Sequence, residues 1–290
     1  MNNRLLPGCA ALILAATRLV LAGPQDADQL IQKVKIVEQS VGYQPTGNFK
    51  RADPRTAAYY RCYFTGIREL PDSYNELRLR KGTRDGCSVD KKKYDVFFYP
   101  VEAVASGHTP VTQSLEAAPV ERVAAVVPHE DFHAQLKGLP DSIAEAAATL
   151  VGLATAAVAV EDVAADVDLF LQKAELINRY YDRLARVYRN EPDRDGVLRE
   201  KRQLLDLLQG ECAAIRPEPR TFNKCLSAPN NAGLAFDHTY TKYYPLVYRV
   251  FRACGRDLPC TIQNIENAPK KRSEADVASY FEALASGSPP

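Results

Sequence analysis

The sequence lacks the charge pattern that marks a nucleic-acid-binding protein. It carries 37 lysine and arginine residues against 36 aspartate and glutamate residues, so its net charge is close to zero. No basic run is interleaved with aromatic residues, as a nucleic-acid surface would require. The run Lys91-Lys92-Lys93 is short and is typical of a solvated loop. We therefore expect no nucleic-acid partner.

Two further patterns are missing. Beyond the N-terminus, no segment is expected to be long and apolar enough to span a bilayer. Residues 144–160 come nearest, but Glu145 and threonine residues interrupt them. The cysteines never occur as C-x-x-C, which disfavours a cysteine-bound zinc ion.

The N-terminus has the pattern of a secretory signal. Arg4 precedes a mostly apolar stretch over residues 9–21, and Val20-Leu21-Ala22 is typical of a cleavage site. Arg18 places a charge inside that stretch. The pattern predicts a signal peptide over residues 1–22, with a non-cleaved N-terminal membrane anchor as the alternative.

The cysteine count fits an oxidising compartment. Seven cysteines occur, and loss of Cys9 with the signal peptide leaves an even number, as in a disulfide framework. We expect an exported protein, periplasmic or secreted, with a single domain over residues 23–290. Pairing neighbouring cysteines closes the shortest loops and predicts the disulfides Cys62–Cys87, Cys212–Cys225 and Cys254–Cys260.

The hydrophobic pattern is mainly helical, and the chain is long enough to bury a core. The segments 166–188 and 195–215 carry helical stripes and are expected to form a hairpin. The fold class is therefore mainly α, an α+β fold with a minor strand region. The predicted helices cover residues 26–41, 142–160, 166–188, 195–215, 231–254 and 273–285.

The strand region lies in the first third of the chain. Residues 94–99 (YDVFFY) are dense in aromatic and β-branched residues and predict a strand that ends at Pro100. The aromatic cluster over residues 56–64 does not indicate whether it forms a helix or a strand. Residues 70–87 are polar and are expected to be irregular, tied by the first disulfide.

The residues His129-Glu130-Asp131-Phe132-His133 match the H-E-x-x-H signature of zinc hydrolases. On a helix, residues four apart share a face, so the two imidazoles can bind one zinc ion. Glu130 is then placed to accept a proton from a zinc-bound water. Pro128 either begins this helix or kinks a longer one within residues 109–138. The alternative is a surface helix with solvated histidines.

A catalytic zinc ion usually takes three protein ligands and a water. A third histidine at metzincin spacing is absent, since Leu139 occupies that position. Glu145 is the best candidate, because the turn after His133 could return its carboxylate to the metal. Ser142-x-x-Glu145 is also a capping box, which is the competing explanation. The remaining candidates are Glu161 and Asp141, of which the latter could instead orient a ligand histidine.

A zinc hydrolase also needs a hydrogen-bond donor for the developing oxyanion. Tyr240 and His238 lie two residues apart on the segment 231–254, so only one of them can readily face the metal. A tyrosine in a tyrosine-rich helix is more often a core residue. Tyr240 is the candidate that we retain, and His108 is a further donor.

Three sequence blocks in this order, VVPHEDFH, AEAAATLVG and NNAGLAFDHTYTKYYP, resemble the bacterial putative aminopeptidase family of gluzincin-type zinc peptidases. The likeness runs in patches between Gly42 and Pro245 and implies a zincin-like helical domain. Asp131 departs from the family, in which an apolar pair fills the motif. The resemblance implies the ligands His129, His133 and Glu145 and the base Glu130, and it marks Asn231 and Tyr240 as matching positions.

The sequence thus predicts an exported zinc peptidase that acts on a peptide substrate. Glu130 would take a proton from the attacking water and pass it to the leaving amine. One alternative is a zinc hydrolase of a non-peptide bond. The other is an exported, disulfide-stapled binding protein without catalysis, which would lack zinc.

Overall fold

The structure is a computed structural model that describes residues 24–104, 107–190 and 193–287, so the predicted signal peptide lies outside the described residues. It is mostly helical, which confirms the mainly α fold class. Its helices are α1 (Pro24–Val41), η1 (Tyr74–Glu76), α2 (Gln113–Glu116), α3 (Val120–Phe132), α4 (Asp141–Ala159), η2 (Glu161–Val163), α5 (Asp166–Asn190), α6 (Arg194–Ala213), α7 (Asn231–Thr241), α8 (Tyr244–Ala253), α9 (Leu258–Glu266) and α10 (Glu274–Ala285). Its strands are β1 (Ala52–Asp53), β2 (Tyr59–Gly66), β3 (Arg78–Lys81), β4 (Tyr94–Val101) and β5 (Val111–Thr112).

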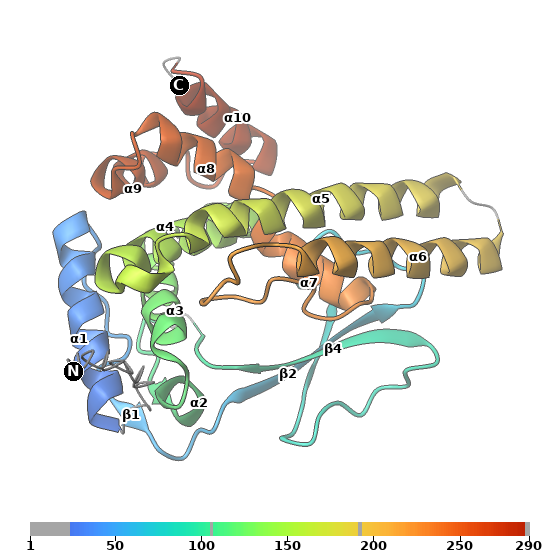
Figure 1. Ribbon diagram of the computed structural model, residues 1–290, viewed down its shortest axis with the longest axis horizontal. Helices are drawn as coiled ribbons and strands as arrows, with labels where there is room; N and C mark the ends of the chain where they lie inside the picture. Colours follow the sequence, from blue (N-terminus) through green and yellow to red (C-terminus); the bar gives the residue numbers. More distant parts are fainter. Residues whose placement is uncertain (1–23, 105–106, 191–192, 288–290) are drawn as a thin grey trace, which may run out of the picture.

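Helix α4 forms the centre of the larger hydrophobic core. Its side chains are mostly alanine and other small residues, and those from Ser142 to Ala156 are buried. Small side chains let helices pack closely, and α1, α3, α7 and α8 all contact α4 (Figure 1). Contrary to the sequence-based expectation, α4 is long and apolar enough to cross a membrane. Because 89% of the apolar 18-residue stretch of α4 is buried inside the protein, α4 has the character of a core helix.

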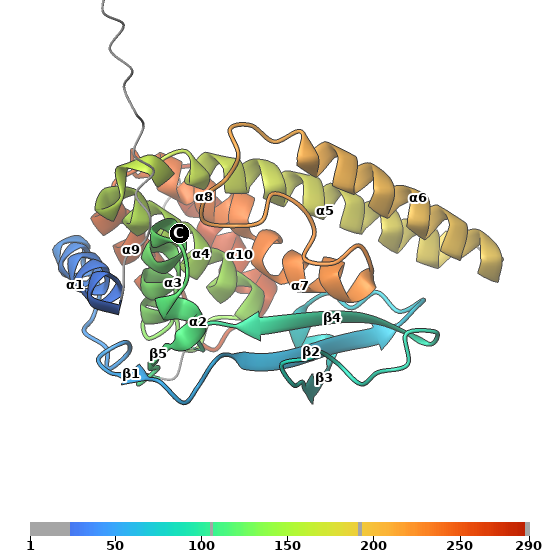
Figure 2. The same cartoon turned by 60° about the horizontal axis from the view of Figure 1, so that its bottom comes forward.

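Helices α5 and α6 form the predicted hairpin, and they run side by side away from the rest of the molecule (Figures 1 and 2). Their apolar stripes meet in a second core that includes Ile177, Leu184 and Leu208. Asp193 caps α6 by accepting hydrogen bonds from the backbone N–H groups of Asp195 and Gly196. The local patterns of the two segments therefore agree with their tertiary packing.

Strand β2 lies between β3 and β4 and pairs antiparallel with both. One face of this sheet packs against α7, where Tyr63, Phe97 and Phe236 form a small third core (Figure 2). The aromatic cluster over residues 56–64, whose secondary structure the sequence leaves open, therefore largely forms strand β2. β4 does not end at Pro100 but continues to Val101, because β4 is an edge strand and tolerates a residue without an N–H.

The segment over residues 70–87 is less irregular than expected, since it contains η1 and β3. The predicted helix over residues 231–254 is in fact two helices, α7 and α8. Pro245 lies in the first turn of α8, where its missing N–H is harmless, but a helix running through it would clash with the carbonyl four residues earlier. Helix α9 was not predicted.

The segment over residues 109–138 is divided by Pro119, which immediately precedes α3. Pro128 lies inside α3, so it does not begin the helix that carries the motif. The helix also ends earlier than predicted, at Phe132, and residues 133–138 form a turn that leads into α4.

Two of the three predicted disulfides are present, Cys62–Cys87 and Cys254–Cys260. The third is wrong for this structure, because Cys212 and Cys225 are free thiols. The sulfur of Cys225 is 3.6 Å from the carbonyl oxygen of Gln209. The interaction with Cys212 lowers the pKa of the Cys225 thiol. Pairing by the shortest loops thus identified two cysteines that are not covalently joined.

Candidate active site

The three predicted metal ligands lie together between α3 and α4. The Nε2 atoms of His129 and His133 are 3.2 Å apart. Glu145 Oε2 is 3.3 Å from His129 Nε2 and 3.5 Å from His133 Nε2. One ligand atom from each of the three residues lies within 4.8 Å of the other two, so the group could hold one metal ion.

Helix geometry explains this convergence. His129 lies in the last turn of α3, and His133 follows the helix with backbone angles that are still helical (φ −54°, ψ −25°), so the two imidazoles share a face. Glu145 comes from the start of α4, and Gly152 lies two turns further along it. A Cβ atom at Gly152 would lie 3.1 Å from the backbone of His129. The glycine therefore allows α4 to approach α3 at the site.

The two carboxylate oxygens of Glu145 have different surroundings. Oε1 accepts a 2.8 Å hydrogen bond from the hydroxyl of Tyr74. Oε2, which faces the imidazoles, is buried and has no hydrogen-bond partner among the described residues. A buried acceptor without a partner is costly, and a cation between it and the imidazoles would satisfy it. The residues present therefore fit a metal ion.

The electrostatic environment favours a charged carboxylate. Burial alone would raise the pKa of Glu145, but electrostatic attraction to the nearby imidazoles of His133 and His129 holds that pKa well below its usual range. For His133, burial opposes protonation, but the nearby Glu145 and Glu130 raise its pKa. The site thus has a net attraction for positive charge, whether that charge is a proton or a metal ion.

The alternatives for the third ligand are placed elsewhere. The capping box is not formed, since α4 begins after Pro140 and its N-cap has no side-chain hydrogen bond. Asp141 lines the cavity but accepts a 2.6 Å hydrogen bond from Asn75 Nδ2. Glu161 is exposed in η2, outside the cavity.

The three candidate ligands open onto a cavity of about 1060 Å³ that is bounded by α3, α4, α7 and the aromatic face of the sheet. Glu130 lines this cavity beside His129. Asp131 lies outside it and is 1% exposed. Asp131 pairs with Lys35 of α1 and accepts hydrogen bonds from Thr46 Oγ1 (2.6 Å) and Asn48 Nδ2 (2.9 Å). Asp131 therefore anchors α3 to α1 and the segment after α1, on the side of α3 that faces away from the cavity.

Tyr240 is close to the ligands. Its ring centroid is 6.2 Å from that of His129 and 6.1 Å from that of Tyr74. Burial, followed by the charge of Glu145, raises the pKa of Tyr240 well above its usual value. Its hydroxyl therefore stays protonated and can donate a hydrogen bond into the cavity.

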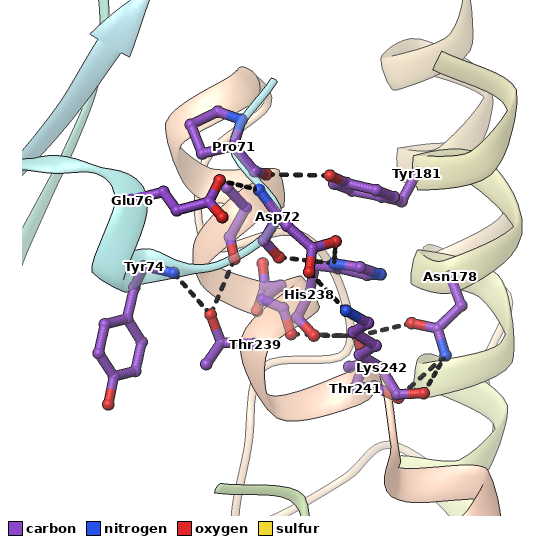
Figure 3. A network of polar contacts seen from close by, with 12 residues as sticks. Pro71, Asp72, Tyr74, Glu76, Asn178, Tyr181, His238, Thr239, Thr241 and Lys242 are labelled. Atoms are coloured by element: carbon purple, nitrogen blue, oxygen red, sulfur yellow. Dashed lines mark hydrogen bonds and ion pairs between the residues drawn. The ribbon is translucent and has the colours of Figure 1, made fainter. Parts of the chain in front are cut away.

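The other sequence-based donor, His238, does not reach the site. Figure 3 shows it on α7 beside Asp72, whose carbonyl oxygen lies 2.8 Å from His238 Nδ1. Its ring stacks on Tyr181, with centroids 3.7 Å apart. His108 is exposed and is not among the cavity residues. As predicted from their spacing, Tyr240 and His238 therefore face different ways.

Asn231, the other late position marked by the resemblance, has a structural environment. It is fully buried, and its Nδ2 atom donates to the carbonyl oxygen of Glu69 (2.7 Å). Its backbone N–H donates to Asp95 Oδ2 (2.8 Å), and its side chain also contacts the hydroxyl of Tyr188. Asn231 thus joins α7 to the sheet and to α5, outside the cavity.

Several residues that line the cavity are not predicted from the sequence. Tyr74 lies in a polar segment, and nothing local indicates that its hydroxyl meets Glu145. Tyr99 could have been found from the two-residue period of YDVFFY, because alternate residues of β4 share a face. Arg122, two turns before His129 on α3, donates to the hydroxyl of Tyr99 (2.9 Å) and pairs with Glu102.

Comparison with known proteins agrees with the sequence resemblance. Residues 87–278, which contain the two histidines and Glu145, match the family described as "Putative aminopeptidase". No curated protein and no solved structure matches the chain. Because the match covers well over half of the sequence, the chain belongs to this aminopeptidase family.

Proposed function

We propose that the protein is an exported zinc-dependent peptidase, an aminopeptidase in which His129, His133 and Glu145 hold the metal. The observation that carries this proposal is the convergence of these three side chains at the wall of a cavity of about 1060 Å³, with Glu130 beside them. Two imidazole nitrogens and one carboxylate form a donor set used by catalytic zinc, with a position left for water. The family description supports peptide-bond hydrolysis.

When bound, zinc would polarise the scissile carbonyl and increase the acidity of the attacking water. The carboxylate of Glu130 then accepts a proton from that water and delivers it to the amine of the leaving group. The hydroxyl of Tyr240 donates a hydrogen bond to the carbonyl oxygen as negative charge develops on it. Tyr74 holds Oε1 of Glu145, so that Oε2 stays directed at the metal position.

Export is supported by the two disulfides, which are typical of oxidising compartments. The N-terminal pattern over residues 1–22 adds to this support, and we assign the rest of the chain to one peptidase domain.

The decisive experiment compares two glutamates that have different roles. Glu130→Gln removes the base but keeps a similar shape, so zinc content should stay near one ion per chain. Cleavage of a peptide library should fall by at least about 10²–10⁴-fold. Glu145→Gln removes a charged ligand, so both zinc and activity should be lost. Glu161→Gln is the matched control, because Glu161 is exposed outside the cavity and should change neither.

Zinc content is measured by metal analysis of carefully prepared protein. Wild-type protein without zinc would overturn the enzyme assignment and favour the binding protein. Zinc without cleavage of any library peptide would favour hydrolysis of another kind of bond. Full zinc content and activity in Glu145→Gln would remove Glu145 from the ligand set.

A further inference from the structure

Five basic side chains line the cavity, and most of them are already neutralised. Arg122 pairs with Glu102 at 2.6 Å, and Lys173 pairs with Asp237 at 3.2 Å. Arg220 contacts Glu121 and Asp162 at 3.1 and 2.9 Å. The other two basic side chains are Lys137, which is exposed to solvent, and Arg61.

Arg61 is half-buried, and it forms no ion pair within the part of the chain that the structure describes. Its side chain makes one hydrogen bond there, a long one of 3.4 Å from Nη1 to the hydroxyl of Tyr63. A guanidinium has five N–H donors in a planar fork, so most of the donors of Arg61 remain free for another partner. A half-buried cation in this state is suited to binding an anion that enters the cavity.

The sheet register places Arg61 on the cavity face. It lies opposite Tyr99 in the pairing of β2 with β4, and both residues line the cavity. Tyr99 accepts a hydrogen bond from Arg122, which lies seven residues before His129 and thus roughly 10 Å away along α3. On the other side, the Tyr63 ring is 6.3 Å from the ring of Tyr74, whose hydroxyl binds Glu145. Arg61 therefore belongs to the wall that leads to the metal ligands.

We infer that Arg61 is a specificity residue that binds a carboxylate of the peptide substrate. Its partner is either an acidic side chain or the C-terminal carboxylate, since both present the two oxygens that a guanidinium fork accepts. This inference rests on the proposed peptidase function. The free donors of Arg61 explain how a cavity with aromatic walls could select among peptides by charge as well as by apolar contact.

The test uses fluorogenic peptides in which one glutamate is moved through successive positions, with glutamine peptides as the matched series. Each peptide is made with a free and with an amidated C-terminus, which distinguishes the two sources of the carboxylate. For the preferred peptide, Arg61→Gln should lower kcat/KM by about 10- to 100-fold, as expected for the loss of one charge-assisted pair. Cleavage of the glutamine-containing amide and the zinc content should not change.

Arg84→Gln is the matched control. Arg84 lies in the exposed turn after β3 and does not line the cavity, so its loss removes the same charge without touching the site. Thermal unfolding of both variants shows whether either has lost its fold. If neither glutamate nor a free C-terminus improves cleavage by wild-type protein, or if Arg61→Gln keeps that preference, the inference is wrong.

Binding measurements separate this inference from the proposed function. The same peptides, labelled for fluorescence anisotropy, are titrated onto Glu130→Gln and onto the double variant Glu130→Gln/Arg61→Gln. Tighter binding of carboxylate-bearing peptides to the first variant alone supports the Arg61 subsite even if wild-type protein cleaves no peptide, in which case the peptidase function fails by itself. Equal binding of both series, or no binding, overturns the subsite.

Discussion

Among single residues, Tyr74 most clearly controls the geometry of the site. Its hydroxyl binds Oε1 of Glu145. Its backbone N–H donates to Thr239 Oγ1 at 2.8 Å, as Figure 3 shows. Tyr74 thereby links the carboxylate of Glu145, the proposed ligand on α4, to helix α7. Hydrogen bonds of this kind orient metal ligands and tune their affinity.

We therefore expect Tyr74→Phe to weaken zinc binding about 10- to 100-fold while the fold is retained. The phenyl ring keeps the contacts with Tyr63 and Phe236, but Oε1 of Glu145 loses its donor. Competition with a chelator measures the affinity. The control is Tyr181→Phe, which removes a 3.2 Å hydrogen bond to the carbonyl oxygen of Pro71 in the same loop. That variant should lose about 1 kcal/mol of stability and no zinc affinity. Equal affinities in both variants would show that Tyr74 does not position the ligand.

The residues of the site differ in how far the sequence could reveal them. His129 and His133 are four residues apart in a helical stretch, so their spacing alone predicts that the two imidazoles share a face, and Glu130 directly follows the first of them. Glu145 could be predicted from the sequence because only a short turn separates its helix, α4, from α3. The contact between Tyr74 and Glu145 joins residues 71 positions apart, and no local pattern encodes it. The acidic residue Asp131 stands out in the motif, but the sequence does not explain its role. Its partners include Lys35 of α1 and Thr46 in the segment that follows α1.

At the scale of whole elements, the site depends on how closely α3 and α4 approach. They pack tightly at Gly152, where an added side chain would meet the backbone of His129 and not a flexible side chain. A backbone cannot move aside without shifting the helix to which it belongs. The position of the first histidine is thus set by a glycine that is not itself part of the ligand group.

Gly152→Val should therefore separate the two helices, with a cost of about 1–3 kcal/mol in stability and a clear fall in zinc affinity. Gly210→Ala is the control, since this helical glycine of α6 has open space around it. Replacing it should stabilise the protein by about 0.5–1 kcal/mol and leave the metal site unchanged. Chemical denaturation and chelator competition on both variants give these two quantities. Unchanged zinc affinity in Gly152→Val would show that the helix contact does not set the site.

The elements themselves were predictable where one local signal dominated. Helices α5 and α6 have continuous apolar stripes, and their hairpin followed from those stripes. The apolar pattern of residues 231–254 predicts one helix, but Pro245 lies in the first turn of a second one, so the segment forms α7 and α8. Helix α9 begins after Asp257, whose side chain accepts from the backbone N–H of Cys260, and Pro259 lies in its first turn. Those capping signals could have identified α9.

For the molecule as a whole, the metal would join parts of the chain that fold into different layers. Of the three proposed ligands, His129 lies on α3, His133 follows it directly and Glu145 lies on α4, and Tyr74 links Glu145 to the region beside the sheet. A ligand that binds only the folded state stabilises it by mass action. The same three residues should therefore contribute to stability as well as to catalysis.

Removing the metal should lower the melting temperature measurably. With free zinc at about 100 times its Kd, binding stabilises the folded state by about 2.7 kcal/mol. For a domain of this size, that stabilisation corresponds to a fall in Tm of roughly 5–10 °C when zinc is removed. Calorimetry or circular dichroism of zinc-loaded and chelator-treated protein measures the difference. In Glu145→Gln the difference should shrink strongly, whereas in Glu130→Gln it should persist, because Glu130 is assigned to proton transfer and not to metal binding. Identical melting of loaded and chelated wild-type protein would mean that the His129, His133 and Glu145 group does not bind zinc in the folded state.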